Sequence, residues 1–381
     1  MHIDQALSLM VISLAAVLLP NLASRMKVPA VVAEILFGLL IGKSLLNIPI
    51  SDEWISILAE IGFLLLMFLA GAEINFSVLE KQKSSNYIFL GALFLSTFIL
   101  SLVCAIFMGR GVFLALILST TSLGLVFPVL SDSGITKTLY GQNILLSAIL
   151  ADFATFFGLT FYLLFTKYGL SWRLFLPIPV FIFFTIFLWA GRFWVWWNPA
   201  KARVLLGDSG STELGVRFSI ALLFIFVALS GIAGLEPVLG AFMGGCILSF
   251  LFREKEKLDE KLASIAYGFL IPVFFIRVGI QMNITSIFNP EGLLFLTKLL
   301  GAALIVKILP SLLLIFKRVP FRYSLAAGVL LSSRLSLIIA VAAIGLREGF
   351  INHATAESII FLALVTSVLG PTAFKRLVPK E

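Results

Sequence analysis

The fold is decided by an apolar stretch that is also irregular, LSTTSLGLVFPVLSDSG at residues 118–134. It combines consecutive hydroxyl side chains at 120–122 with Gly124 and Pro128. Proline removes a backbone donor and glycine loosens a helix, whereas hydroxyl groups can satisfy the backbone groups that are freed. An ordinary kink would explain this stretch alone, but GVLLSSRLSLIIA at 328–340 shows a similar interruption. Two interrupted spans in corresponding halves of a chain indicate a mid-membrane site built from discontinuous helices.

The composition of the chain requires a membrane. Of 381 residues, 60% are hydrophobic and 13% are charged, with a mean hydropathy of +1.10. This leaves too little polar surface for a water-soluble domain, and apolar stretches of about 20 residues, enough to cross a bilayer, recur throughout. We expect an all-α polytopic membrane protein with about 13 transmembrane helices. The expected spans lie near 4–24, 28–47, 54–77, 86–108, 112–131, 140–166, 173–195, 214–233, 237–252, 262–283, 292–316, 321–346 and 355–374.

The connecting segments predict an orientation. Segments expected on the cytoplasmic side are rich in lysine and arginine, such as 253–261. Segments expected outside carry fewer basic residues, namely Lys43, Arg110, Lys167, Arg173 and Arg347. The positive-inside rule then predicts an external N-terminus and a cytoplasmic C-terminus. The net charge of +8 reflects this bias, so it does not indicate a nucleic-acid partner.

Ionisable residues within the expected spans are candidates for function, because such residues usually face a protein interior or an aqueous cavity. They are Glu34, Glu73, Asp152, Arg277, Lys298, Lys307 and Arg334. Lys298 lies near a span end, where snorkelling explains it better than transport does. Structural pairing explains Arg277 and Arg334 as well as transport does, and helix packing through nearby glycines explains Glu34 equally well.

Asp152 stands out among these residues. It is the one acid in the middle of its span, in SAILADFATFF at 147–157, and its neighbours one turn away are Ala, Ile, Thr and Phe. No local partner neutralises it, so it requires water, a cation, a proton or a group from another helix. Inverted topology would bring Asp152 near Lys307, which also belongs to a span adjacent to an interrupted one.

Six motifs in order resemble the bacterial monovalent cation:proton antiporter-2 family, which has the sodium/proton antiporter fold. They are VVAEILFGLLIGKS, EIGFLLLMFLAGAEIN, STTSLGLVFPVLSDSG, EPVLGAFMGG, IPVFFIRVG and LSSRLSLIIA. The resemblance covers essentially the whole chain, which makes it one exchanger-type membrane domain over 1–381. It implies inverted repeats with two crossed broken helices, here the fifth and twelfth spans. It also implies a moving core bundle, including about 54–166 and 262–374, and dimerisation helices, including about 4–47 and 173–252.

The resemblance also assigns residues. It implies that Asp152 binds the transported monovalent cation or the proton, and that Thr121 and Ser122 face the ion from the unwound stretch. Lys307, in LIVKILPS, matches the family's mid-membrane lysine, and Glu73 matches an acidic position of the family. With Arg277 and Arg334, these are the expected supporting charges.

The chain departs from the family pattern at two places. Relatives commonly carry an acid or amide immediately before the essential aspartate, whereas this chain has Ala151. Lys307 then lacks its usual counter-ion, so we expect it to contact Asp152 itself, or Glu73. The segment after Arg334, SSRLSL at 332–337, also lacks the Gly-Glu-Phe that many potassium-efflux relatives have.

We therefore expect an elevator-type antiporter that exchanges Na+ for H+ in the bacterial cytoplasmic membrane, contributing to pH homeostasis. With one carboxylate at the site, exchange of one cation for one proton would be electroneutral. A K+/H+ antiporter and a Na+-coupled solute symporter on the same fold remain alternatives. No nucleophile–base pair or metal-ligand cluster suggests an enzyme or a bound cofactor. The expected partners are a second copy of the chain and membrane lipid.

Overall fold

The computed structural model describes residues 3–26, 28–42, 45–46, 52–74, 84–136, 138–171, 213–232, 235–252, 256–282 and 289–378, with scattered positions between 182 and 198. Every regular element in these segments is helical. The all-α prediction is therefore confirmed for the described part of the chain. The expected span at 173–195 lies mostly outside the described residues.

The chain divides into two compact units, each made of two separate segments. Unit 1 comprises Met1–Lys81 and Leu163–Gln281, and unit 2 comprises Gln82–Tyr162 and Met282–Glu381. The expected core bundle, about 54–166 and 262–374, overlaps both units, since the boundaries at Lys81 and Gln281 fall within its two segments. The division into a moving core and dimerisation helices therefore stays a prediction.

Unit 1 is built on close helix contacts that glycine permits. Its elements are α1 (Ile3–Met26), α2 (Ala30–Ile41), α3 (Asp52–Ala72), α11 (Leu214–Ile232), α12 (Pro237–Leu251), α13 (Glu256–Ile265), the π-helical turn η2 (Ala266–Leu270) and α14 (Ile271–Gln281). Helix α3 packs against α12 and α14, and α2 packs against α14. A Cβ atom on Gly245 of α12 would lie 2.8 Å from the backbone nitrogen of Ala72, and one on Gly279 of α14 would lie 2.8 Å from that of Leu39. The small residues at these positions therefore let the helix backbones touch.

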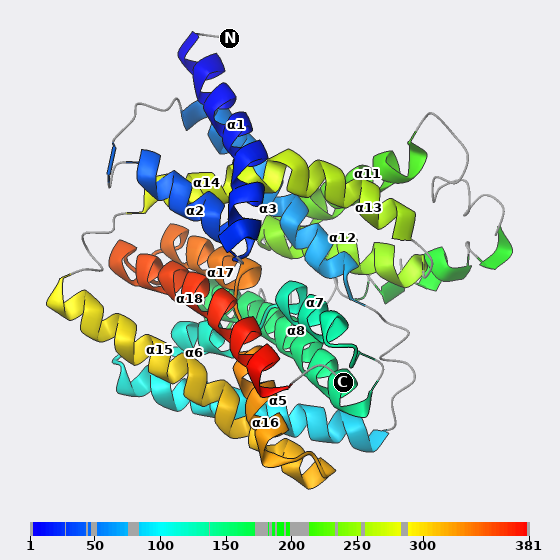
Figure 1. Ribbon diagram of the computed structural model, residues 1–381. Coiled ribbons are helices and arrows are strands. Elements are labelled where there is room, and N and C mark those ends of the chain that lie inside the picture. Colours follow the sequence, from blue (N-terminus) through cyan, green and yellow to red (C-terminus); the bar gives the residue numbers. More distant parts are fainter. Residues whose placement is uncertain are drawn as a thin grey trace. The chain divides into compact units, whose positions relative to one another are not determined.

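Unit 2 repeats one pattern twice: a long helix, a broken helix and a second long helix (Figure 1). The first set is α5 (Ser84–Phe107), α6 (Val112–Ser119) with α7 (Leu123–Asp132), and α8 (Leu139–Tyr168). The second set is α15 (Pro290–Ser311) with the 3₁₀ turn η4 (Leu312–Lys317), α16 (Phe321–Leu331) with α17 (Ser336–Arg347), and α18 (His353–Leu377). Both predicted interruptions are thus present, at residues 120–122 and 332–335.

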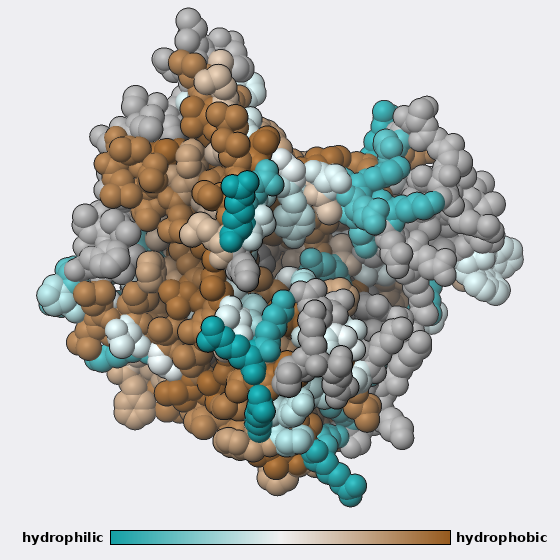
Figure 2. Space-filling view, viewed as in Figure 1, coloured by the Kyte–Doolittle hydropathy of each residue, from teal (hydrophilic) through white to brown (hydrophobic). Residues whose placement is uncertain are grey.

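The helices have the length and surface of membrane spans. Among the described residues, nine helical stretches are long and apolar enough to cross a bilayer, and shorter apolar helices lie at Ala30–Ile41, Pro237–Leu251, Phe321–Leu331 and Leu337–Arg347. Large apolar side chains are exposed on the outer faces, for example Leu18 on α1 and Leu294 on α15, each 56% exposed. Figure 2 shows apolar side chains covering much of the visible surface of α1 and α15. Lipid is the solvent that suits such surfaces, so the chain is a multi-pass membrane protein.

Candidate functional site

The first broken helix frees backbone carbonyl groups inside unit 2 for partners outside the helix. Helix α6 ends at Ser119, where Thr120 adopts an extended conformation (φ −57°, ψ 156°) and interrupts the helix. Helix α7 begins three residues later, and the carbonyl of Ser122 accepts the hydrogen bond of Val126 N at 3.0 Å. The last carbonyl groups of α6 therefore have no partner within their own helix, and they carry the partial negative charge of a helix C-terminus.

Two buried cations bind these carbonyl groups. The Lys307 ammonium donates to the carbonyl oxygen of Ser119 and to Thr121 Oγ1, both at 2.7 Å. The Arg334 guanidinium donates to the carbonyl oxygen of Leu118, also at 2.7 Å. Lys307 is 4% exposed and Arg334 is fully buried. The positive charges thus lie where the α6 dipole favours them, which offsets part of the cost of burying them.

Arg334 also connects the second break to the first. It lies in the 332–335 break itself and donates to the Ser332 carbonyl at 3.2 Å. It further donates to the Ala303 carbonyl on α15, at 3.4 Å from Nη1 and 3.3 Å from Nη2. One guanidinium therefore joins both breaks and a long helix. These hydrogen bonds are consistent with a structural role for Arg334.

Helix α15 presents Lys307 through a close contact with α16. A Cβ atom on Gly328 of α16 would lie 2.6 Å from the Ile308 Cα atom and 3.1 Å from the Lys307 carbonyl oxygen. The Ser311 hydroxyl donates to the Ser324 carbonyl of α16 at 2.8 Å, one turn beyond Lys307. Because backbone packs directly on backbone here, the position of the Lys307 side chain depends on a residue without a side chain at 328.

Asp152 lies on α8, where it is partly buried, and its carboxylate acts electrostatically on the Lys307 ammonium. Arg334 acts on the same ammonium with the opposite sign. On the inward face of α8, Ala148 and Ala151 are buried beside the acid. The contact expected between Asp152 and Lys307 stays a prediction, and the hydrogen bonds of Lys307 to Ser119 and Thr121 add partners that the sequence did not suggest.

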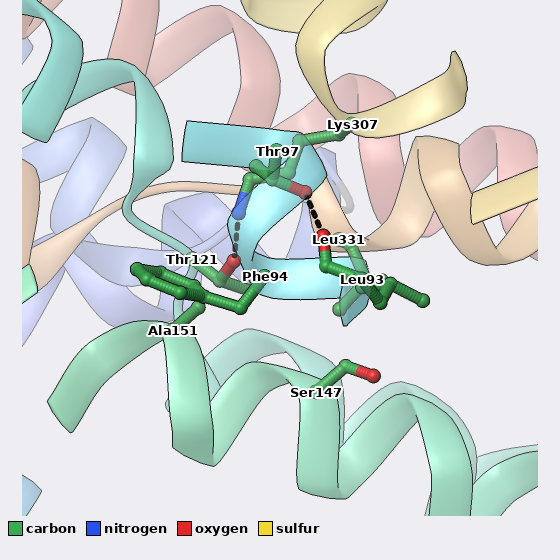
Figure 3. A pocket seen from close by; sticks show the side chains of 8 residues that line it. All are labelled: Leu93, Phe94, Thr97, Thr121, Ser147, Ala151, Lys307 and Leu331. Atoms are coloured by element: carbon green, nitrogen blue, oxygen red, sulfur yellow. Dashed lines mark hydrogen bonds between the residues drawn. The ribbon is translucent and has the colours of Figure 1, made fainter. Parts of the chain in front are cut away.

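A small cavity of about 10 Å³ lies at this point in unit 2, roughly the room of one water molecule. Its walls come from α5, the first break, α8, α15 and α16, and the lining residues are Leu93, Phe94, Thr97, Thr121, Ser147, Ala151, Lys307 and Leu331. Figure 3 shows Lys307 bonded to Thr121 across the cavity from Ala151. The residue that stands where relatives have an acid or amide thus lines the same cavity as the lysine.

The structure brings some of the predicted residues together and leaves others apart. Thr121, Asp152, Lys307 and Arg334 all lie in unit 2, and Ser122, 3% exposed, immediately precedes α7. The other supporting charges, Glu73 and Arg277, belong to unit 1. There Glu73 is exposed and acts electrostatically on Tyr267 of η2.

Sequence reasoning missed several members of the site. Thr97 and Ser147 line the cavity from α5 and α8, and their hydroxyls donate to Leu93 and Asn143 carbonyls one turn earlier. The hydroxyl residues one turn apart in FLSTFILS, at 94–101, are a signal that could have identified α5. The carbonyl oxygens of Leu118 and Ala303 could not be identified from the sequence, because every residue has a backbone carbonyl group.

A family model described as "Sodium/hydrogen exchanger, transmembrane" matches residues 10–380. The chain belongs to the sodium/hydrogen exchanger family. The sodium/proton antiporter resemblance of the motifs is thereby confirmed, although the matching description is not the antiporter-2 name that they suggested. The two broken helices of this exchanger are a feature that the resemblance to the sodium/proton antiporter fold implied.

Curated relatives and a solved structure agree with this assignment. The exchanger is 36% identical to the putative Na+/H+ antiporter YjbQ of Bacillus subtilis, over 98% of this chain and 63% of the relative. The chain therefore spans less than two thirds of that relative. It is 27% identical to the probable Na+/H+ antiporter 3 of Methanocaldococcus jannaschii, over 94% of this chain and 93% of the relative. The structure of the sodium proton antiporter MjNhaP1 from the same organism matches with a TM-score of 0.68 at 17% identity, covering 99% of each chain.

Proposed function

We propose that this exchanger is a secondary antiporter that exchanges a monovalent cation, with Na+ favoured, for H+ across the bacterial cytoplasmic membrane. The observation that carries the proposal is the buried Lys307 ammonium, bonded to the Ser119 carbonyl at the end of α6 and within electrostatic range of the Asp152 carboxylate on α8. Two relatives, named as a putative and a probable Na+/H+ antiporter, support Na+ and H+ as the two exchanged ions.

The exchange chemistry follows from one carboxylate that binds either a proton or a metal cation. Asp152 can hold a proton or an alkali cation, and holding both would leave a positive charge without compensation. Oxygen ligands suit a hard cation, and the site offers the Asp152 carboxylate, the Thr121 hydroxyl and backbone carbonyl groups. The Lys307 ammonium, bonded to Ser119 and Thr121, compensates the charge of the Asp152 carboxylate when the carboxylate binds neither ion.

Electroneutral exchange is part of the proposal. Ala151 gives the site no second acid, and the Lys307 ammonium keeps its bonds to neutral oxygens. One proton and one monovalent cation bring equal charge to Asp152, so a one-for-one cycle moves no net charge. If Lys307 released and rebound its proton during the cycle, or if Glu73 carried a second proton, the cycle would be electrogenic, and a potential-dependent reversal point would reveal it.

The division into two units supports an elevator-type cycle. Unit 2 contains the network around Asp152, so it is the candidate moving core, and unit 1 is the candidate fixed scaffold at which two copies would dimerise. We place the N-terminus outside and the C-terminus in the cytoplasm because basic residues concentrate in the segments that would then be internal.

K+ in place of Na+ is the second candidate for the exchanged cation. The Na+/H+–K+ antiporter GerN of Bacillus cereus is 24% identical over 96% of this chain, and the K+/H+ antiporter 1 of yeast is 22% identical over 90%. A symporter of organic solutes is less well supported, because the relatives named above are described as antiporters.

Purified protein in liposomes containing a pH-sensitive dye tests the proposal. Addition of Na+, K+ or Li+ outside should release internal protons, with Na+ effective at the lowest concentration. To test electroneutrality, the membrane potential is clamped with K+ and valinomycin while Na+ drives the flux. The reversal point should not move with potential; a strong shift would exclude one-for-one exchange, and absence of any cation-driven proton flux would exclude antiport.

A further inference from the structure

Three buried helical threonines of this protein follow a common rule. Thr97 donates to the Leu93 carbonyl at 2.8 Å, Thr160 to Phe156 at 3.0 Å and Thr366 to Leu362 at 2.9 Å. In each case the acceptor lies one helical turn earlier, the local partner that threonine ordinarily takes in a helix. A threonine bonded in this way has committed its proton to its own backbone.

Thr155 on α8 departs from this rule. It is fully buried, yet among the described residues its hydroxyl has no hydrogen-bond partner. The Ala151 carbonyl occupies the position that serves as acceptor for the other threonines. Leaving a buried hydroxyl without a partner costs about 1–3 kcal/mol, so such a group in a native interior requires an explanation.

The position of Thr155 on α8 suggests why its hydroxyl has no partner within the described protein. It lies three residues after Asp152 and four after Ala151, so all three share one face of α8, with about 5–6 Å between neighbouring Cβ atoms. Ala151 lines the cavity between α8 and Lys307 (Figure 3). Thr155 therefore lies one turn along α8 from the cavity wall at Ala151, with its Cβ atom about 5–6 Å from that of Asp152.

We propose that Thr155 is a cation ligand whose hydroxyl oxygen binds the transported cation together with the Asp152 carboxylate. The inference rests on the proposed function and specifies the ligand set of that site. A neutral hydroxyl can interact with Asp152 in both of its forms, with a cation bound and with a proton bound. Its lone pairs coordinate a hard alkali cation, and they accept a hydrogen bond from the carboxyl group when Asp152 is protonated.

The test removes the oxygen while keeping the shape. Thr155→Val is nearly isosteric and loses the hydroxyl, whereas Thr155→Ser keeps it. The matched control is Thr160→Val on the same helix, where a buried hydroxyl is already bonded to the Phe156 carbonyl. In liposomes, the apparent KM for Na+ should rise about tenfold in Thr155→Val, equivalent to about 1.4 kcal/mol. It should stay within about twofold of wild type in Thr155→Ser and in Thr160→Val, a difference below about 0.5 kcal/mol.

Two further measurements keep the result interpretable. If Thr155→Val fails to fold, Thr155→Ala is compared with Thr155→Ser, because both lose the methyl group and only one loses the hydroxyl. Thermal stabilisation of the detergent-solubilised protein by Na+ gives a binding readout independent of flux, and it should weaken only in the variants without the hydroxyl.

The outcomes separate this inference from the proposed function. If wild type exchanges Na+ for H+, Asp152→Asn does not, and removal of the Thr155 hydroxyl leaves KM and Na+ stabilisation unchanged, the ligand assignment is wrong and antiport stands. An equal rise of KM in Thr155→Val and Thr160→Val would also overturn the assignment, because it would report general packing. A wild-type protein without cation-driven flux would overturn both proposals.

Discussion

Replacing Lys307 by glutamine probes how a buried cation holds the broken helix. The ammonium makes two bonds of 2.7 Å, to the Ser119 carbonyl and to the Thr121 hydroxyl, in a position 4% exposed to solvent. A hydrogen bond to a charged group contributes about 1.5–3 kcal/mol, and removing one member of a buried charged set costs about 3–5 kcal/mol. Glutamine can still donate to one acceptor, and it spares the desolvation of an ammonium. We therefore expect a net loss of about 2–4 kcal/mol of unfolding free energy.

The assay is thermal unfolding of purified protein in detergent, followed together with cation-driven proton flux in liposomes. A loss of this size should lower the melting temperature by about 4–16 °C, given about 2–4 °C for each kcal/mol in a domain of about 150–250 residues. The matched control is Lys298→Gln on the same helix, where the lysine is exposed and its replacement should change stability by less than about 0.5 kcal/mol.

Two results would refute this reasoning in different ways. Melting of Lys307→Gln at the wild-type temperature would mean that the bonds to Ser119 and Thr121 contribute nothing net to stability. We also expect flux to be reduced, or its pH dependence to shift, but not to vanish. Complete loss of flux in a protein that melts normally would make Lys307 part of the transport chemistry instead of a support for it.

Three further predictions concern the carrier, the packing and the orientation. Asp152→Asn should abolish cation-dependent proton flux, because the amide has a similar size but can neither ionise nor take the proton; near-normal flux would contradict the carrier role. Gly328→Ala should lose about 1–3 kcal/mol of unfolding free energy in a denaturation assay, since its Cβ would meet the α15 backbone. Gly301→Ala, with open space around the site, should not be destabilised in this way. Cysteines introduced at Lys81 and Lys257 should react with an impermeant reagent from the cytoplasmic side only, and labelling of both from outside would reverse the orientation.

Much of the architecture could be predicted from the sequence because a membrane imposes strict local rules. Long apolar stretches must be helical in lipid, so the all-α fold follows from hydropathy. The Gly, Pro and hydroxyl residues at 118–134 and 328–340 mark both breaks, and the structure interrupts its helices at 120–122 and 332–335. The family motifs then add Asp152 and Lys307. These features were predictable because each is written in a short segment of the chain.

The partition into units could be predicted only in part. Hydropathy identifies the segments 54–77 and 262–283 as spans but does not say which other helices they contact. In the structure α3 packs against α12 and α14, which places these segments in unit 1. The cause is a set of backbone contacts at glycines such as Gly245 and Gly279, and such contacts depend on which two helices meet.

By itself, the sequence determined the membrane fold, the two helix breaks, the family and the single acid at Asp152. Only the tertiary structure decided which atoms surround that acid. Lys307 binds oxygens 186 and 188 residues away in the chain, and Arg334 binds a carbonyl 216 residues away. Carbonyl oxygens are present at every residue, so sequence cannot single out those of Ser119 and Leu118. They become cation ligands because a helix ends there and the folded unit brings buried positive charges to its negative end.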